Sequence, residues 1–252
     1  MREFLLSRIR EAGEICRAEQ VKLQDADVEY KHGREIVTRV DRQVEMFLRE
    51  QINDRYPDHG IIGEEGGTTL GGASHCWIID PIDGTTSYRF GQSYYSISVA
   101  LRVDNELSAA SVYAPALGQL FYAQRGDGAF LDGVRISVSG RRLNEAILST
   151  GFACLRSGWQ DNNLKYFNRL VPRILDIRRC GSAALDMAYV ACGKYDGFWE
   201  LNLNLYDIAA GALLVAEAGG RVCDFSGGGS YPEQGIVAAN PGLTAEILPY
   251  LR

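Results

Sequence analysis

Two segments near the start of the chain carry apolar residues at helical spacing. Residues 2–23 place Phe4, Ile9 and further apolar side chains three or four positions apart, with arginines and glutamates between them. A second segment of this kind runs from about 40 to 56 and stops before Pro57, which cannot continue a helix. The pattern therefore predicts two amphipathic helices that pack together.

The hydrophobic pattern then changes to short runs of β-branched and aromatic residues. Runs such as WIID, YYSISVALRV and QLFYAQ are separated by glycine, aspartate and asparagine. The sequences RGDG at 125–128 and LDG at 131–133 are turn signals between consecutive strands. We therefore expect the first part of the chain, about 1–145, to form a mostly antiparallel sheet behind the two helices.

From about residue 146 to 252 strand and helix patterns alternate, as in an α/β arrangement. The segments GSAALDMAYVACG and DIAAGALLVAEAGG consist mostly of small residues and end in glycine, which suits helices packed closely against a sheet. Neither a repeat nor a long linker separates the two parts. We therefore expect one domain over 1–252, with subregions of about 1–145 and 146–252 around a shared core.

Composition narrows the class of protein. The chain has 252 residues, of which 46% are hydrophobic, so it can form a sizeable core. Its 26 basic and 32 acidic residues give a net charge of −6, which argues against nucleic acid as the main partner. Six scattered cysteines form no C-x-x-C pair, and neither a secretion signal nor a run of 18 apolar residues occurs. We expect a cytoplasmic protein without a membrane partner.

The segment WIIDPIDGTT, residues 77–86, combines an apolar run with two carboxylates. Asp80 ends that run, and Pro81 interrupts a regular strand, so we expect Asp83 in a turn where both carboxylates point at one spot. Gly84 allows a ligand to approach the backbone closely, and the threonines after it offer hydroxyls beside N–H groups. This combination is typical of a site that holds a cation together with an oxyanion.

Two further acidic positions fit the same chemistry. Glu64 lies in GEEGG after an apolar pair, and Asp207 lies at the start of a predicted helix. Mg²⁺ prefers hard oxygen ligands: a few carboxylates, several waters and a substrate phosphate. Taken alone, GEEGG also fits a solvated turn and Asp207 a helix N-cap, so spacing does not decide between these interpretations.

The order of these motifs resembles the inositol monophosphatase family of Mg²⁺-dependent, lithium-sensitive phosphatases. The likeness extends over about 1–245 and rests on GEE, WIIDPIDGTT, GSAALD and YDIAAGALLVAEAGG. It implies an α/β (α+β) fold, a layered α-β-α-β-α sandwich of the sugar phosphatase and inositol monophosphatase type. It also implies a homodimer, a small phosphorylated polyol or sugar as partner, and hydrolysis of a phosphate monoester through in-line attack by metal-activated water.

The resemblance also assigns roles to individual residues. Two or three Mg²⁺ ions would be held, with Asp80 as the bridging ligand, by Glu64, Asp80, the carbonyl of Ile82, Asp83 and Asp207. The catalytic residues would be Glu64, Thr85 and Asp80, the first two holding the attacking water. Substrate contacts would come from Asp83, Gly84, Thr85, Gly181, Ser182, Ala183, Glu200 and Asp207.

Several positions keep a structural alternative or depart from the family pattern. Ser182 also fits a helix cap. Asp41 falls where the family has an acidic residue near the metal site, although we expect it to be the N-cap of the helix after it. Tyr206 stands where the family usually has Trp, a change that keeps an aromatic plane beside Asp207. Arg89 faces either substrate or solvent.

The sequence is compatible with several substrates. Inositol 1-phosphate is favoured over histidinol phosphate, adenosine 3′,5′-bisphosphate and fructose 1,6-bisphosphate. Relatives directed at nucleotides usually have longer chains, and those acting on histidinol phosphate commonly have Lys where Thr86 stands. The chain could also serve as a non-catalytic interaction module whose acidic cluster binds cations structurally, although it retains every expected ligand.

Overall fold

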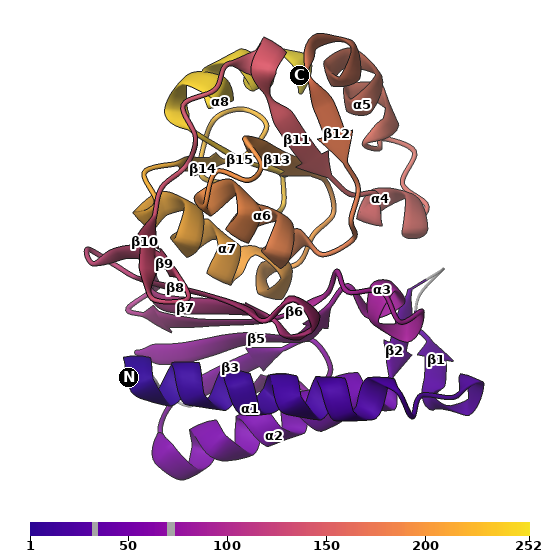
Figure 1. Cartoon of the computed structure of the whole chain (residues 1–252), viewed down its shortest axis with the longest axis vertical. Helices are drawn as coiled ribbons and strands as arrows, with labels where there is room; N and C mark the ends of the chain where they lie inside the picture. Colours follow the sequence, from indigo (N-terminus) through magenta and orange to yellow (C-terminus); the bar gives the residue numbers. More distant parts are fainter. Residues whose placement is uncertain (32–34, 70–73) are drawn as a thin grey trace.

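The computed structural model describes residues 1–31, 35–69 and 74–252. Its elements stack in layers that alternate helix, sheet, helix, sheet, helix (Figure 1). The expected α-β-α-β-α sandwich is therefore confirmed. Within the described residues, no helix is both long enough and apolar enough to cross a membrane.

The first layer is the pair of helices α1 (Arg2–Gln20) and α2 (Arg39–Arg55), close to the predicted bounds. Their apolar sides pack together against one face of the larger sheet, around the fully buried Trp77 (Figure 1). Between them the chain forms a small separate sheet from β1 (Val28–Tyr30) and β2 (Ile36–Thr38).

The larger sheet has eight strands in the order β10-β9-β8-β7-β6-β5-β3-β4, and only β3 and β5 pair in parallel. The predicted antiparallel sheet and its consecutive hairpins are thus confirmed. The strands are β3 (Gly60–Gly63), β4 (Gly67–Thr69), β5 (His75–Asp83), β6 (Ser96–Val103), β7 (Glu106–Ala114), β8 (Gln119–Gln124), β9 (Gly128–Leu131) and β10 (Val134–Ile136).

Strand β5 does not end at Asp80, so the sequence-based expectation of a turn there is wrong. Asp80 pairs with Ser98 and Asp83 pairs with Ser96, so one extra residue is inserted in β5. Pro81 lacks the N–H that a regular ladder requires, and the chain accommodates it by this bulge. Residues three apart in a regular strand face opposite sides. The extra residue therefore brings both carboxylates to the same side.

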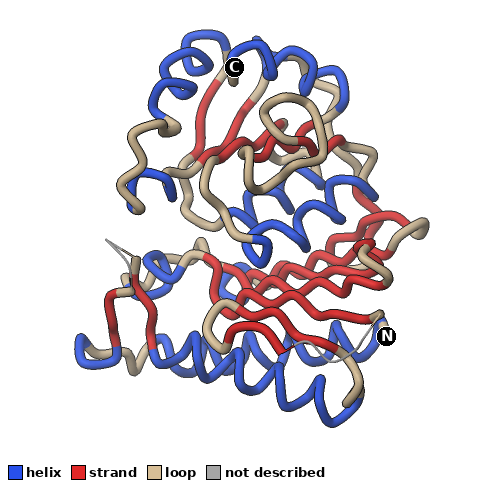
Figure 2. The backbone as a smooth tube through the Cα atoms, turned by 180° about the vertical axis from the view of Figure 1, so that it is seen from behind, coloured by secondary structure: helices blue, strands red, loops and turns tan. Residues whose placement is uncertain are grey.

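The middle layer consists of α6 (Ala183–Ala191) and α7 (Leu205–Glu217), which lie between the two sheets (Figures 1 and 2). Their small residues allow close contact: a Cβ atom on Gly211 would lie 2.6 Å from the Cβ of Met187. The core around them joins residues of both parts of the chain, such as Ile78 and Phe198.

The second sheet has the order β12-β11-β13-β15-β14, with β11 parallel to both of its neighbours. Its strands are β11 (Ile147–Thr150), β12 (Asp176–Arg178), β13 (Gly197–Glu200), β14 (Arg221–Cys223) and β15 (Ile236–Ala239). The other helices are α3 (Thr85–Arg89), α4 (Ala153–Arg156), α5 (Leu164–Leu170) and α8 (Pro241–Ile247). Short 3₁₀ turns occupy Asp25–Asp27, Pro115–Leu117, Leu143–Glu145, Val171–Arg173 and Leu248–Tyr250.

Candidate active site

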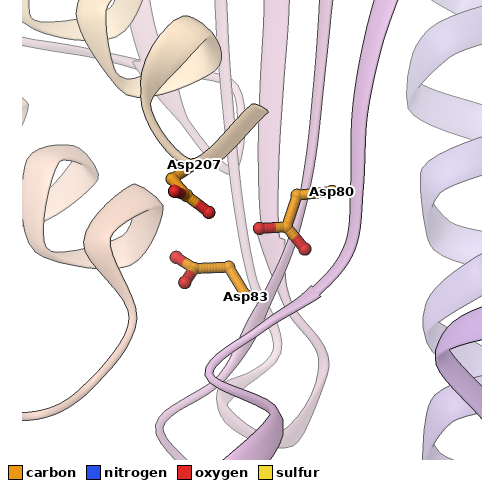
Figure 3. A group of neighbouring side chains, drawn as sticks. All are labelled: Asp80, Asp83 and Asp207. Carbon is orange, nitrogen blue, oxygen red and sulfur yellow. The ribbon is translucent and has the colours of Figure 1, made fainter. Parts of the chain in front are cut away.

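Three carboxylates converge where the larger sheet meets the middle helices. Asp80 and Asp83 come from the bulged end of β5, and Asp207 comes from the first turn of α7 (Figure 3). Each offers an oxygen atom, and these atoms lie within 4.8 Å of one another. Asp207 is not an N-cap: Asn204 holds that position, and its N–H donates to Asp207 Oδ2 at 2.6 Å. Three of the predicted metal ligands are thus neighbours in space.

Asp80 is buried, Asp83 and Asp207 are half-buried, and the negative charge of the three is poorly compensated. Burial raises the pKa of Asp80 and of Asp207 well above the ordinary range, and the neighbouring carboxylates raise it further. Burial also raises the pKa of Asp83 to about 6, although the Ser182 hydroxyl and the Ala184 N–H both donate to this carboxylate. Buried anions of this kind require a partner, and a divalent cation is the partner that suits oxygen ligands.

Glu64 lies in the turn directly after β3, as predicted. It lines a cavity of about 470 Å³ beside the three converging carboxylates but is not one of them. The Lys31 Nζ atom lies 2.9 Å from Glu64 Oε1 and 2.6 Å from Glu65 Oε1. Sequence analysis did not identify Lys31, because a single lysine outside the motifs gives no signal. The role of Glu64 as a ligand and water holder stays a prediction.

Gly84 joins β5 to α3, and Thr85 is the first residue of that helix. Gly84 has φ +96°, and a Cβ atom there would lie 3.1 Å from the carbonyl oxygens of Gly181 and Tyr94, so both conformation and space require glycine. The Thr85 Oγ1 atom lies 3.1 Å from the carbonyl oxygen of Ile82 and 3.1 Å from Asp41 Oδ1. The turn thus exposes backbone while it holds the threonine hydroxyl in place.

Asp41 is not an N-cap, so that expectation is wrong. Thr38 caps α2, and Asp41, already inside the helix, accepts hydrogen bonds from the Thr38 N–H at 2.9 Å and the Thr38 hydroxyl at 2.5 Å. Its other oxygen faces Thr85. Burial raises the pKa of Asp41 to about 7. Asp41 therefore connects the start of α2 to Thr85, beside the candidate site, where the resemblance had implied an acidic residue.

Ser182 fits both interpretations given to it. It is the N-cap of α6 and accepts from the Leu185 N–H at 3.3 Å, while its hydroxyl donates to Asp83 Oδ2 at 2.7 Å. Gly181 before it has φ +98°. Ser182 and Ala183 both line the cavity, although their contact with substrate stays a prediction.

Glu200 ends β13 and also lines the cavity. Its Oε1 accepts from the Ala153 N–H at 2.9 Å, and burial raises its pKa to about 7. A Cβ atom on Gly151 would lie 2.1 Å from Glu200 Oε2, so Gly151 provides the space for this carboxylate. Sequence analysis missed Gly151, because a lone glycine before Phe152 resembles any strand end.

Two adjoining cavities meet at these residues. One, of about 470 Å³, contains Glu200 and Ser182 in its wall, and the other, of about 460 Å³, contains Asp80 and Gly84. The walls of both include Glu64, Asp83, Asp207, Arg156, Arg179 and Gly181. The two arginines were not predicted. Arg89, which was expected to face substrate or solvent, is absent from the walls of both cavities and forms an ion pair with the exposed Asp25.

Together the fold and the site define a class, that of layered α/β proteins with a buried acidic site suited to divalent cations. The chain belongs to the inositol monophosphatase family, whose model matches residues 1–252. This family is generally Mg²⁺-dependent, and membership supports phosphatase activity. The resemblance stated from the motifs is therefore confirmed.

Individual relatives carry different names. The chain is 42% identical to a Nus factor SuhB of Pseudomonas aeruginosa, over 100% of this chain and 97% of the relative. It is 39% identical to an inositol-1-monophosphatase of Rhizobium meliloti, over 94% and 90%. A crystal structure of the extragenic suppressor protein suhB from Bartonella henselae superposes with a TM-score of 0.94 at 33% identity, over 100% and 98%. Similarity to these proteins fixes the fold and family more firmly than the substrate.

Proposed function

We propose that the protein is a Mg²⁺-dependent phosphatase that hydrolyses a small phosphate monoester, with inositol 1-phosphate as the substrate. The observation that supports this proposal is the convergence of Asp80, Asp83 and Asp207 beside the Gly84–Thr85 turn. The carboxylates can hold cations, and backbone N–H groups at a helix start can donate to a phosphate oxygen.

The residues present fit Mg²⁺ by their chemistry. Within the described part of the chain, the only hydrogen bond that Asp80 accepts comes from the Ile82 N–H at 3.1 Å, so most of its acceptor capacity is left for another group. The candidate donor set consists only of hard oxygens: Glu64, Asp80, the carbonyl of Ile82, Asp83 and Asp207. Bound Mg²⁺ supplies positive charge for the phosphate oxygens and lowers the pKa of bound water.

The protein residues would position the reactants. Backbone N–H groups of Gly84 and Thr85 would donate to the phosphate oxygens. The absence of a side chain on Gly84 lets this backbone pack against the carbonyl groups of Gly181 and Tyr94. The Thr85 hydroxyl, which Asp41 holds in place, would share the attacking water with Glu64. This arrangement would align the water with the ester before reaction, which is a major part of phosphoryl-transfer catalysis.

The other cavity would take the alcohol half of the substrate. Glu200 would accept hydrogen bonds from hydroxyl groups, and Gly181, Ser182 and Ala183 would shape the opposite wall. An acceptor that is buried and charged favours a polyol over an apolar alcohol.

Release of phosphate tests the proposal directly. We expect inositol 1-phosphate and p-nitrophenyl phosphate to be hydrolysed with Mg²⁺ but not with EDTA. Histidinol phosphate, adenosine 3′,5′-bisphosphate and fructose 1,6-bisphosphate should be poorer substrates. About 50 mM LiCl should inhibit relative to KCl of equal ionic strength, since equal ionic strength equalises screening. Absence of release from every one of these esters would contradict the proposal.

A role as an interaction module is the second candidate. It is favoured by the names of several relatives, which at about 40–42% identity are called Nus factor SuhB. A protein that lacks phosphate release but gains thermal stability from Mg²⁺ would fit this alternative, because the cation would then serve the fold alone.

A further inference from the structure

Glu45 is a buried carboxylate on helix α2, outside the motifs that point to the candidate active site. Its Oε2 atom accepts a hydrogen bond from the Glu65 N–H at 2.7 Å, and its Oε1 atom accepts one from the Gly66 N–H at 2.8 Å. Both donors belong to the turn GEEGG, residues 63–67, and directly follow Glu64. A carboxylate of the helix therefore holds the backbone of the turn that carries a candidate metal ligand.

Two glycines of this turn provide the space for Glu45. A Cβ atom on Gly63 would overlap Glu45 Oε1, and a Cβ atom on Gly66 would lie 2.8 Å from the same oxygen. A side chain at either position would therefore collide with the carboxylate. The turn sequence is thus fitted to a carboxylate of another element, a requirement that the turn's own sequence pattern does not reveal.

Arg49, one helical turn after Glu45, adds a second contact to the same turn. Its Nε atom donates to Glu45 Oε1 at 2.7 Å, and its Nη2 atom donates to the carbonyl oxygen of Gly67. The guanidinium group is partly buried, and its charge compensates that of Glu45. The ion pair therefore holds both the N–H groups and a carbonyl group of the turn.

The same face of α2 also contacts the other side of the candidate site. Asp41, Glu45 and Arg49 are each four residues apart, so they lie along one face of the helix. Asp41 accepts from the Thr85 hydroxyl at 3.1 Å, while Glu45 holds the turn directly after Glu64. One helix thus contacts both segments whose side chains are proposed to share the attacking water.

Glu64 depends on its turn for its position, because turns are more mobile than the elements that they connect. Its own N–H donates to the carbonyl oxygen of Ile79 in β5 at 3.3 Å, a long hydrogen bond. A metal ligand or water-holding group acts well only if it is held within about 0.5 Å of the required geometry. Residues that orient such a group typically change metal affinity or activity by about ten- to a hundredfold.

The inference rests on the proposed phosphatase function and adds two positioning residues to it. We infer that Glu45 and Arg49 hold the turn GEEGG so that the Glu64 carboxylate keeps its distance from Thr85 and from the three converging aspartates. They act through Glu64 rather than by contact with the substrate or the cation.

The variant Glu45→Gln tests the inference. Glutamine keeps the size of the side chain but turns an NH₂ group toward N–H donors, so the turn loses a contact. With p-nitrophenyl phosphate at saturating Mg²⁺ we expect kcat to fall about tenfold or more, while KM changes by less than about twofold. The Mg²⁺ concentration at half-maximal rate should rise. Arg49→Gln should change kcat in the same direction but less, because Glu45 stays in place.

Glu217→Gln is the matched control. Glu217 ends α7 and accepts hydrogen bonds from the N–H groups of Gly126 and Gly128, each at 3.0 Å. This carboxylate therefore also holds a glycine turn through backbone donors, but away from both cavities. The control should keep the kcat and the Mg²⁺ dependence of wild type. Equal losses in Glu45→Gln and Glu217→Gln would show a general effect on stability and would overturn the inference.

Binding of Mn²⁺ in the absence of substrate separates this inference from the proposed function. The electron paramagnetic resonance signal of free Mn²⁺ gives the affinity without turnover. Glu45→Gln should bind Mn²⁺ about ten- to a hundredfold more weakly than wild type and Glu217→Gln do. That result supports the positioning role even if wild type releases no phosphate.

The opposite result is equally clear. Phosphate release by wild type, together with unchanged kcat and unchanged Mn²⁺ affinity in Glu45→Gln, rejects the positioning role and leaves the phosphatase proposal intact. Circular dichroism confirms that each variant is folded. Should Glu45→Gln fail to fold, Arg49→Gln is judged by the same measurements against the same control.

Discussion

Asp224 and Asp80 are equally hidden from solvent, each with 1% of its surface exposed, but their surroundings differ. Asp224 follows β14 and is enclosed by its own loop. It accepts hydrogen bonds from the Ser226 hydroxyl at 2.6 Å and from the N–H groups of Ser226, Gly228 and Ser230, each at 2.8 Å. These donors, the Ser226 hydroxyl first, lower the pKa of Asp224 to about 2.

Asp80 has the opposite environment. It accepts one hydrogen bond, from the Ile82 N–H, and its nearest charged groups are carboxylates. Burial together with Glu64, Asp83 and Asp207 raises its pKa well above the ordinary range. The same chemical group is thus stabilised as an anion by the donors of a loop close to the surface, and destabilised as an anion deep in the protein beside other carboxylates.

The difference distinguishes a structural carboxylate from a functional one. A loop that satisfies its own aspartate needs no ligand, because the donors are already supplied by the chain. A cluster of carboxylates without hydrogen-bond donors lowers the stability of the fold unless a bound cation offsets the repulsion. Such a loss of stability is typical of functional sites. Substitution of each aspartate by asparagine separates the two cases.

The largest effect is expected for Asp80→Asn on catalysis. The asparagine keeps the shape but removes the charge that would bridge the metal ions. Turnover at saturating Mg²⁺ should fall about a hundred- to a thousandfold, the equivalent of several kcal/mol of transition-state stabilisation. Steady-state assays with p-nitrophenyl phosphate measure this loss. A variant that keeps more than a tenth of wild-type turnover would show that Asp80 does not bridge.

Asp224→Asn should give the next largest effect, on stability rather than catalysis. Its amide group would place N–H donors against the N–H groups of the loop, at a cost of about 3 kcal/mol in the free energy of unfolding. Urea denaturation measures this loss, and kcat of the folded variant should stay at the wild-type value. A lower kcat at unchanged stability would reverse the assignment of the two aspartates.

Acid provides an internal check on Asp224. Its pKa is about 2 in the folded protein and about 3.9 in an unfolded chain, so its carboxylate stabilises the fold above about pH 4. That stabilisation is lost as the pH falls through about 2. The difference in stability between wild type and Asp224→Asn should therefore shrink between pH 4 and pH 2.

Glu200 is an intermediate case, with one backbone donor and a pKa of about 7. Glu200→Gln keeps an acceptor for the Ala153 N–H but removes the negative charge. We expect a loss of about ten- to a hundredfold in kcat/KM for inositol 1-phosphate, with p-nitrophenyl phosphate much less affected because it has no hydroxyl groups. Equal losses on both substrates would assign Glu200 to the metal site or to the fold.

The smallest expected effect is on stability, and it tests the comparison of Asp80 with Asp224 most directly. In EDTA at neutral pH, Asp80→Asn should be more stable than wild type by about 1 kcal/mol, because a buried repulsive charge is removed. Mg²⁺ should then stabilise wild type more than the variant. Thermal unfolding with and without Mg²⁺ measures both quantities. A variant that is less stable than wild type in EDTA would mean that the protein itself already stabilises the negative charge of Asp80.

Much of the fold could be predicted from sequence because it depends on local periodicity. The helices over 2–23 and 40–56 and the hairpins at 125–128 and 131–133 are close to the observed elements. Helix α5 covers only Leu164–Leu170, and a 3₁₀ turn containing Pro172 follows it. The end of β5 was misplaced because its bulge depends on the pairing with β6, which no local pattern specifies.

The candidate site was predictable only where residues belong to motifs. WIIDPIDGTT and the α7 sequence led to Asp80, Asp83 and Asp207, which the structure brings together. Lys31 and Arg156 are isolated basic residues with ordinary neighbours in the sequence, and Arg179 stands beside Arg178, just before the GSAALD motif but outside it. Only the folded chain places them beside the carboxylates, so their contribution could not be read in advance.

The distribution of the acidic centre along the chain has a consequence for synthesis. Asp83 and Asp207 are separated by roughly 120 positions, and at about 5–20 residues per second the ribosome adds the second of them roughly 6–25 s after the first. Until then the carboxylates of β5 stay close to water, because the helix that covers them has not yet been made. The acidic centre is completed only when α7 inserts between the two sheets. In a newly made molecule, the insertion of α7 and the binding of a cation would therefore occur together, late in translation.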